Sequence, residues 1–425
     1  MTRLRKRGIT VYVSCLTVVF LASIQFYLLG DITTKKNEML LDDAPTLFEE
    51  ANATTAKKTT APFSFSACLI LKDDNTILPE WLAYHYTMLP LDRLIVGVDT
   101  LSHTDPTPIL DAYQSIGMKI TTWKNDSFWI DGVESWAKKE YAITNSTSYD
   151  DLRKRKRYRQ NIFYEACFRK LQKEGRRWSL MIDVDEYLAF NFYDESEKKS
   201  SSDYNVTKNT RSEINESPPE TMAEVVNHWD IDPKLPCITF ARYLFTSTET
   251  FGDNSTELPQ QLLLHPDFNA SLFHTLRYRQ RAPLNGQQAG KSIIDASRYN
   301  GAPINNPHRI PKLCTGSNVF PNNKVMPFRV HHYVGSWEAF RSPGFDPRGR
   351  SYFDKRNNVK NTVTDSTMSA WLDRFTLLVG ADKAIEMTQT LRLHAELEMK
   401  RKIEEQEQQK QYDWEKLNTK TKDWL

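Results

Sequence analysis

The chain lacks a strong net charge, and it lacks the cysteine patterns that are typical of zinc sites. Its 56 basic and 54 acidic side chains leave a formal charge of +2, which argues against a general nucleic-acid-binding surface. Its five cysteines form no Cys-x-x-Cys pair and no Cys/His spacing of the zinc-binding kind. We therefore expect neither nucleic acid as a partner nor a zinc centre.

A long uncharged run near the N-terminus stands out from this mixed composition. Residues 9–30 are largely apolar and long enough to span a bilayer. The basic residues before this run are Arg3, Arg5, Lys6 and Arg7. By the positive-inside rule they keep residues 1–8 in the cytosol, which predicts a signal-anchor at 9–30 and a single-pass type II topology. A cleaved signal peptide is the alternative.

Two further patterns agree with entry into the secretory pathway. Asn-x-Ser/Thr sequons on the predicted lumenal side begin at Asn52, Asn125, Asn145, Asn205, Asn215, Asn254 and Asn269. The cysteines beyond the anchor are Cys68, Cys167, Cys237 and Cys314. Four thiols allow three pairings, and their spacing does not choose among them.

Composition divides the rest of the chain into segments. Residues 31–62 are polar and predict a flexible stem. A globular domain is expected at 63–380, interrupted by a Ser-, Glu- and Lys-rich surface insertion at 192–221. The last part, 381–425, is highly charged with poor apolar periodicity, and it predicts an exposed helical or disordered tail.

Apolar runs and helical patterns alternate at the start of the globular part. They predict strands at 67–71, 94–98 and 118–123, with helices at 80–88 and 108–116 between them. This alternation indicates an α/β fold with a mostly parallel sheet flanked by helices. Further on, we expect a helix at 151–175 and strands at 179–182, 238–245, 291–294 and 329–333.

Three carboxylates follow the predicted strand at 179–182: Asp183, Asp185 and Glu186. In an extended chain Asp183 and Asp185 point the same way, because side-chain direction repeats every two residues. Open α/β sheets bind ligands at the carboxyl ends of their strands. Two oxygen donors there suit a divalent cation that keeps water and phosphate ligands. An Asp-x-Asp motif alone is common by chance. The apolar strand before it and the other motifs of the chain make a metal site the favoured interpretation here.

The order of several pieces resembles the metal-dependent glycosyltransferases of the GT-A fold, most closely the family 92 type and related family 2-like proteins. The matching pieces span roughly residues 63–340 and are 71–74, 80–85, 94–102, the helix with Gln160 and Cys167, 178–187, 290–292, His308 and 331–333. There are two departures from the family pattern. Residues 97–102 replace the usual aromatic-Asp-Asn/Asp-x-Ser form, and a large insertion follows Tyr187.

The resemblance implies a GT-A (Rossmann-like) domain and a nucleotide-sugar donor, a UDP-sugar such as UDP-galactose. Mn²⁺ or Mg²⁺ would bridge Asp185 and the diphosphate, while Asp183 would contact ribose or a metal-bound water. His332 is the first choice to complete the metal shell and His308 the second, because neutral imidazole suits Mn²⁺ better than Mg²⁺. The other residues expected to bind the donor are Lys72, Asp73, Asp99 and Lys291.

The implied reaction is an inverting transfer to a glycan or glycoprotein acceptor in the Golgi lumen. A carboxylate would take the proton of the acceptor hydroxyl, and Glu186 and Glu338 are the candidates. Two other interpretations stay open. In a glycosidase, two of Asp183, Asp185 and Glu186 would act as acid and nucleophile. In a non-catalytic glycan-binding or scaffold protein, the fold would remain without nucleotide binding.

Overall fold

A computed structural model describes much of the chain beyond residue 64. The described residues are 65–125, 127–128, 149–190, 236–249, 267–283, 290–301, 303–304, 306, 308, 313–314, 328–337, 340, 349–368 and 370–422. The chain divides into two units, 1–60 and 61–425, and every described residue belongs to the second. The predicted cytosolic tail, signal-anchor, stem and surface insertion lie outside the described residues. Among the helices that are described, none is both long and apolar enough to cross a membrane.

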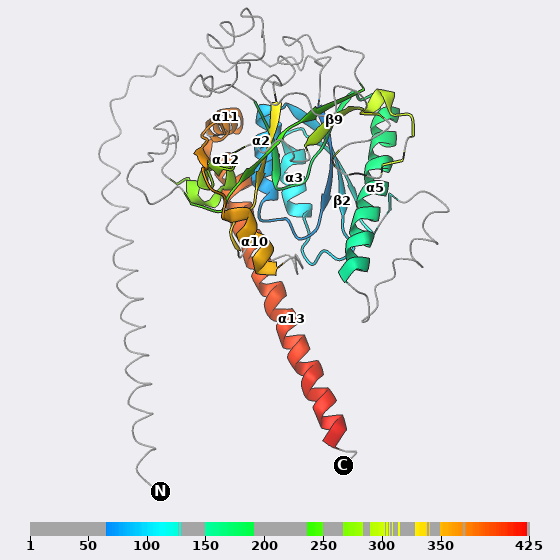
Figure 1. Ribbon diagram of the computed structural model, residues 1–425, viewed down its shortest axis with the longest axis vertical. Helices are drawn as coiled ribbons and strands as arrows, with labels where there is room; N and C mark the ends of the chain where they lie inside the picture. Colours follow the sequence, from blue (N-terminus) through cyan, green and yellow to red (C-terminus); the bar gives the residue numbers. More distant parts are fainter. Residues whose placement is uncertain are drawn as a thin grey trace, which may run out of the picture. The chain divides into compact units, whose positions relative to one another are not determined.

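The first half of the described chain alternates strands and helices, as the sequence predicts. The strands are β1 (Phe65–Leu71), β2 (Leu91–Val98), β3 (Lys119–Trp123) and β4 (Trp178–Met181), and the helices between them are α2 (Leu78–Met88), α3 (Thr107–Ser115) and α5 (Tyr149–Lys173). The four strands pair in parallel. Two later strands, β9 (Lys291–Asp295) and β6 (Cys237–Phe240), extend the sheet to the order β3-β2-β1-β4-β9-β6 (Figure 1). Of the six strands, only β9 runs in the opposite direction, and it pairs antiparallel with both β4 and β6. The prediction of an α/β fold with a mostly parallel sheet is therefore confirmed for this sheet.

Glycine and proline set the ends of the helices between these strands. Pro79 lies in the first turn of α2, where its missing N–H costs no helical hydrogen bond. Gly117 follows α3 with a φ of 101°, and Gly175 follows α5 with a φ of 69°. These left-handed conformations suit glycine and end both helices where the sequence predicts.

The two faces of the parallel sheet bury different helices. Along β1, Ala67 and Leu69 pack in a core with α2 and α3, whereas Cys68 packs in a second core with α5. Alternate residues of a strand point to opposite faces, so one short apolar run serves both cores. The helices α2 and α3 therefore cover one face and α5 covers the other (Figure 1).

A second sheet of five strands contacts α2 through its strand at 186–190, and the sequence does not predict this sheet. Its order is β11-β8-β7-β10-β5. The strands are β5 (Glu186–Phe190), β7 (Arg242–Phe245), β8 (Gln280–Arg281), β10 (Phe328–Tyr333) and β11 (Val363–Thr364). The single strand expected at 238–245 is wrong: the segment breaks at Ala241, with β6 in the first sheet and β7 in the second.

The helix α2 connects the two sheets through its polar atoms. Trp81 donates its indole N–H to the Glu186 carbonyl over 2.9 Å, and Tyr84 donates its hydroxyl to the Leu188 carbonyl over 2.8 Å. The Leu188 amide donates to Nε2 of His85 over 3.3 Å. All three side chains are buried, so α2 supplies hydrogen bonds to β5 as well as apolar surface.

The C-terminal helices pack partly on the core and become exposed along the last of them. They are α10 (Gly349–Asn357), α11 (Trp371–Val379), α12 (Ala381–Ile385) and α13 (Leu391–Lys422), with a π-helical turn at Glu386–Thr390. Short helical turns also lie at Ala270–Leu272, His274–Arg277 and Ala296–Arg298. Ala384 and Met387 are buried, so the start of the predicted tail packs on the domain. Residues 403–414 are exposed in one helix, which agrees with the predicted helical character of the rest.

Two disulfides choose among the three pairings that the sequence leaves open. Cys68 pairs with Cys167 and joins β1 to α5, while Cys237 pairs with Cys314.

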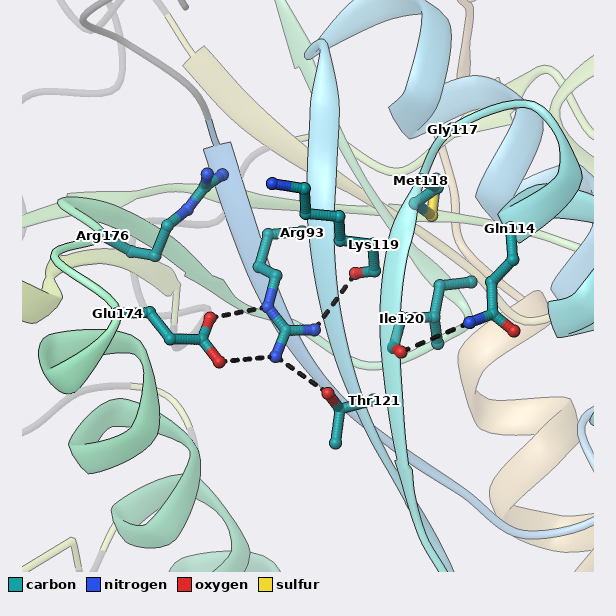
Figure 2. Close-up of a pocket in the computed structure, with 9 residues that line it drawn as sticks. All are labelled: Arg93, Gln114, Gly117, Met118, Lys119, Ile120, Thr121, Glu174 and Arg176. Atoms are coloured by element: carbon teal, nitrogen blue, oxygen red, sulfur yellow. Dashed lines mark hydrogen bonds and ion pairs between the residues drawn. The ribbon is translucent and has the colours of Figure 1, made fainter.

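At the opposite edge of the sheet from the ends of β1 and β2, Arg93 directs all five of its N–H groups to acceptors in β2, β3 and the segment after α5. Figure 2 shows these bonds to Glu174, Lys119 and Thr121 in a cavity of about 730 Å³. Because every N–H group of Arg93 is already hydrogen-bonded within the protein, Arg93 has a structural role in this cavity: it joins β2, β3 and the residue after α5.

We expect non-reducing peptide mapping to recover the Cys68–Cys167 and Cys237–Cys314 pairs. Replacing Cys68 and Cys167 together by serine should lower the free energy of unfolding by about 2–5 kcal/mol, because the bond closes a long loop. Urea unfolding under non-reducing conditions measures this loss. Recovery of Cys68 joined to Cys237 or Cys314 would contradict the pairing.

The contributions of two buried histidines to stability should fall as the pH falls from about 6.5 to 4. Burial lowers the pKa of His85 to about 3 and, with the charges of Arg392 and Arg277, that of His274 to about 3. The unfolded chain, in which histidine titrates near 6.5, therefore binds more protons than the folded chain in this range. Urea midpoints measured at pH 7.0, 5.5 and 4.5 test this. Replacing His85 by Gln should flatten the slope, and an unchanged slope would exclude His85 as a source.

Candidate functional site

The three carboxylates of the Asp-Val-Asp-Glu stretch meet at a tight turn between the two sheets. The chain leaves β4 at Met181 and enters β5 at Glu186, and the Glu186 amide donates to the Asp183 carbonyl over 3.0 Å. Ligand atoms of Asp183, Asp185 and Glu186 all lie within 4.8 Å of one another. The predicted proximity of the two aspartates is confirmed, but a turn produces it and not an extended strand.

The ammonium group of Lys291 lies inside this acidic cluster. Its Nζ is 2.8 Å from Oδ2 of Asp183 and 2.9 Å from Oε2 of Glu186, and its side chain is 0% exposed. The antiparallel register of β4 and β9 pairs Met181 with Ser292. Lys291, one residue before Ser292, therefore lies beside the start of the turn that follows Met181. A Cβ on Gly290 would lie 1.8 Å from the Phe240 carbonyl oxygen, so only glycine fits before Lys291.

The second sheet supplies a histidine and an arginine to the same cluster. His332 of β10 pairs in register with Glu186 of β5, and directly opposite residues share one face of a sheet. Nε2 of His332 is 3.1 Å from Oδ2 of Asp185. Arg242 of β7 donates to Oε1 of Glu186 over 3.2 Å. Six ionisable side chains from β7, β9, β10 and the turn thus converge.

Opposite charges keep Lys291, Asp183 and Asp185 ionised. Burial pushes the pKa of Lys291 down, but the charges of Asp183 and Glu186 raise it above its ordinary value. Burial likewise pushes the pKa of Asp185 up, yet the charge and hydrogen bond of His332 lower it below its ordinary value. The side chains of Asp183 and Asp185 are each 40% exposed, whereas that of Glu186 is 0% exposed. The two aspartates are therefore the acids of the cluster that solvent can reach.

The helix α5 approaches the turn from the other face of the parallel sheet. Gln160 donates its side-chain N–H to Oδ1 of Asp183 over 3.0 Å. Burial pushes the pKa of Asp183 up, but the charge of Lys291 lowers it, and the charge of Lys156, one turn before Gln160 on the same helical face, lowers it further. Lys156 is exposed, so α5 adds a positive charge near the two aspartates from the solvent side.

The acids expected to bind the donor at the ends of β1 and β2 both hold the loop that follows β2. The Asp73 carboxylate accepts hydrogen bonds from the amides of His103 and Thr104 over 2.6 and 2.9 Å. Asp99 forms an ion pair with Arg159 and accepts the Leu101 amide over 2.8 Å. These bonds shape the rim beside the cluster.

The remaining expected site residues take different places. Lys72 is half-buried, and its amide donates to Asp74 over 2.8 Å. Burial, with the charges of Lys291 and Arg242, lowers the pKa of His308 to about 4. His308 therefore lies close enough to the cluster for its charges to act on the imidazole. Glu338 lies outside the described residues.

Two expected roles do not fit the geometry and need correction. Glu186 is too deeply buried to take a proton from an acceptor hydroxyl, and both of its oxygens are engaged by cations. Lys291 is fully buried against two carboxylates, so its ammonium does not face a donor phosphate. Both residues sit behind the two exposed aspartates and support them.

Two further residues of the site were not among the expected ones. Arg242 interrupts an apolar strand run, and a lone cation in such a run is a signal for a buried acidic partner. Asp74 lies at the end of β1, and desolvation, with a smaller contribution from the nearby charge of Asp185, raises its pKa to about 7. Sequence alone contains no sign of that shift, which comes mainly from burial in the folded chain.

The residues present fit a divalent cation. Asp183 and Asp185 offer partly exposed carboxylate oxygens, the donors that hard cations prefer. His332 adds an imidazole whose Nδ1 is buried without a hydrogen-bond partner, and whose Nε2 lies beside Asp185. A mixed carboxylate and imidazole set suits Mn²⁺ better than Mg²⁺.

Comparison with protein-family models finds no match to this chain, and comparison with curated proteins finds none either.

Glu186 should contribute far more to stability than Asp185. Replacing Glu186 by Ala leaves the buried ammonium of Lys291 with one carboxylate fewer, which should cost about 3–5 kcal/mol of unfolding free energy. Replacing the 40% exposed Asp185 by Ala should change it by about 1 kcal/mol or less. Urea unfolding of both variants tests the contrast, and equal losses would contradict the buried ion pair.

Proposed function

We propose that this chain is a metal-dependent glycosyltransferase that uses a nucleotide-sugar donor, a UDP-sugar such as UDP-galactose. The observation that carries the proposal is the cluster of Asp183, Asp185 and Glu186 after a parallel strand, with Nε2 of His332 3.1 Å from Asp185. Ligands of open α/β sheets bind at that edge. The resemblance of the segments around the cluster to GT-A enzymes adds the donor class and the inverting transfer to a glycan or glycoprotein acceptor.

In this proposal Asp185 and His332 hold the cation, and Asp183 orients its water or the donor ribose. When bound, the cation supplies charge that stabilises the departing nucleotide diphosphate. Gln160 fixes the orientation of Asp183 through its 3.0 Å hydrogen bond. Lys156 on the exposed face of α5 adds a further positive charge on the side where phosphate would approach.

A glycosidase is the weaker interpretation, because of the carboxylate geometry. Glycosidases place their two carboxyl groups on opposite sides of a sugar, about 5–5.5 Å apart in retaining enzymes and about 6.5–9.5 Å apart in inverting ones. Here the ligand atoms of the three acids lie within 4.8 Å of one another on one turn. The most accessible pair, Asp183 and Asp185, is also engaged by Lys291 and His332.

The proposed compartment is the Golgi lumen, with the chain anchored as a single-pass type II membrane protein. Its basis is the apolar run at 9–30 and the basic residues before it. The two disulfides suit an oxidising compartment. The sequon residues Asn125 and Asn269 are exposed, as glycan acceptors must be.

The full chain, purified in detergent, should bind UDP only in the presence of Mn²⁺, and Asp185→Ala should abolish that binding. The reason is that Asp185 provides the accessible carboxylate for the cation. Calorimetry with UDP and Mn²⁺ measures the binding, and release of UDP from a panel of UDP-sugars measures transfer.

The matched control is Asp111→Ala, which removes an exposed aspartate from α3, far from the cluster in the sequence and not part of it. It should bind UDP like the unmodified chain. UDP binding by Asp185→Ala equal to that of the control would refute the metal role. Transfer that persists in excess chelator would favour a different chemistry.

A further inference from the structure

The position of Lys291 bears on how many cations the acidic cluster holds. Its ammonium bridges Asp183 and Glu186 at 2.8 and 2.9 Å and is fully buried. An ammonium group carries three donors and no acceptor, so this group occupies the space between two carboxylates as a small metal ion would. The close approach of Gly290 to the Phe240 carbonyl holds the backbone before it in place.

Charge balance limits what else the cluster can bind. Asp183, Asp185 and Glu186 carry three negative charges, and Lys291 and Arg242 return two positive ones. The cluster therefore keeps a net charge of −1, which a single divalent cation more than offsets in the absence of nucleotide. A second divalent cation would have to displace the ammonium from Asp183 and Glu186.

The remaining donors also favour a single cation position. Glu186 is closed off from solvent, with Lys291 on one oxygen and Arg242 on the other. Asp185 is 40% exposed and lies 3.1 Å from Nε2 of His332. Asp185 and His332 are thus the pair that a cation can reach without breaking the Lys291 ion pairs.

We propose that Lys291 is a resident cation of the site, which restricts the cluster to one divalent cation held by Asp185 and His332. Lys291 acts through Asp183 and Glu186, so it is a positioning residue and not a ligand of the donor. The inference rests on the proposed function for what the divalent cation does. The stoichiometry of cation binding follows from the geometry of the lysine alone.

The test counts bound Mn²⁺ without nucleotide, using the full chain in detergent and the paramagnetic resonance signal of free Mn²⁺. The unmodified chain should bind one Mn²⁺. Lys291→Met should bind two, or bind one roughly tenfold or more tightly, because a neighbouring positive charge is lost and two carboxylates are released. Lys291→Arg keeps the charge and should bind one with ordinary affinity. Lys124→Met removes a lysine from an exposed ion pair with Asp105 and should match the unmodified chain.

A second variant covers the case in which Lys291→Met does not fold. Glu186→Gln combined with Lys291→Met removes one charge of each sign, so the cluster keeps its net charge. Asp183 is then released from the ammonium, and the Mn²⁺ affinity should rise by roughly tenfold. An unchanged affinity in this double variant overturns the proposal.

The outcomes separate this inference from the proposed function. Two Mn²⁺ on the unmodified chain, or equal count and affinity in Lys291→Met, overturn the role of Lys291 and leave the glycosyltransferase proposal standing. No Mn²⁺ on the unmodified chain with or without UDP, but one on Lys291→Met, overturns the single-cation site proposed for the unmodified chain and refutes metal dependence. No Mn²⁺ on either protein refutes both.

Discussion

The buried ion pair of Lys291 with Asp183 and Glu186 is the interaction on which the site depends. It joins the two sheets, because Lys291 begins a strand of the first sheet and Glu186 begins a strand of the second. A fully buried ammonium requires partners, and breaking such a pair costs more than the pair contributes. The same interaction holds one carboxylate inward and leaves two at the surface. Structure and candidate chemistry therefore share one set of contacts.

The helix α2 is the second element that both sheets need. Its apolar face belongs to the core under the parallel sheet, while Trp81, Tyr84 and His85 bind the backbone of β5. Hydrogen bonds from buried side chains to strand carbonyls are costly to lose. They fix the turn of Asp183 to Glu186 at the rim of the first sheet. The cluster is therefore held by contacts on both sides of the turn, from α2 beneath and from β9 beside it.

Much of the first sheet could be predicted from the sequence because its signals are local. Apolar runs such as 67–71 and 94–98 are each a complete strand core, and Pro79 and Gly175 mark helix ends by backbone geometry alone. The second sheet could not be predicted in the same way. Its strands β8 and β11 have two residues each, and β7 follows β6 with one residue between them. Strands this short are formed by hydrogen bonds to neighbouring strands that are distant in the sequence, and no local apolar pattern marks them.

The sequence by itself determined the alternation of strands and helices, the proximity of Asp183 and Asp185, and the number of cysteines beyond residue 30 that are available for pairing. Those properties follow from near neighbours and from the two-residue and 3.6-residue repeats of the backbone. Only the tertiary structure decided which cysteines pair, that Glu186 is buried, and that Lys291 and His332 meet the aspartates. These contacts join residues 99 and 77 positions apart in the disulfides and 108 apart in the Lys291–Asp183 hydrogen bond. Burial and charge at such distances are set by packing, which no local pattern encodes.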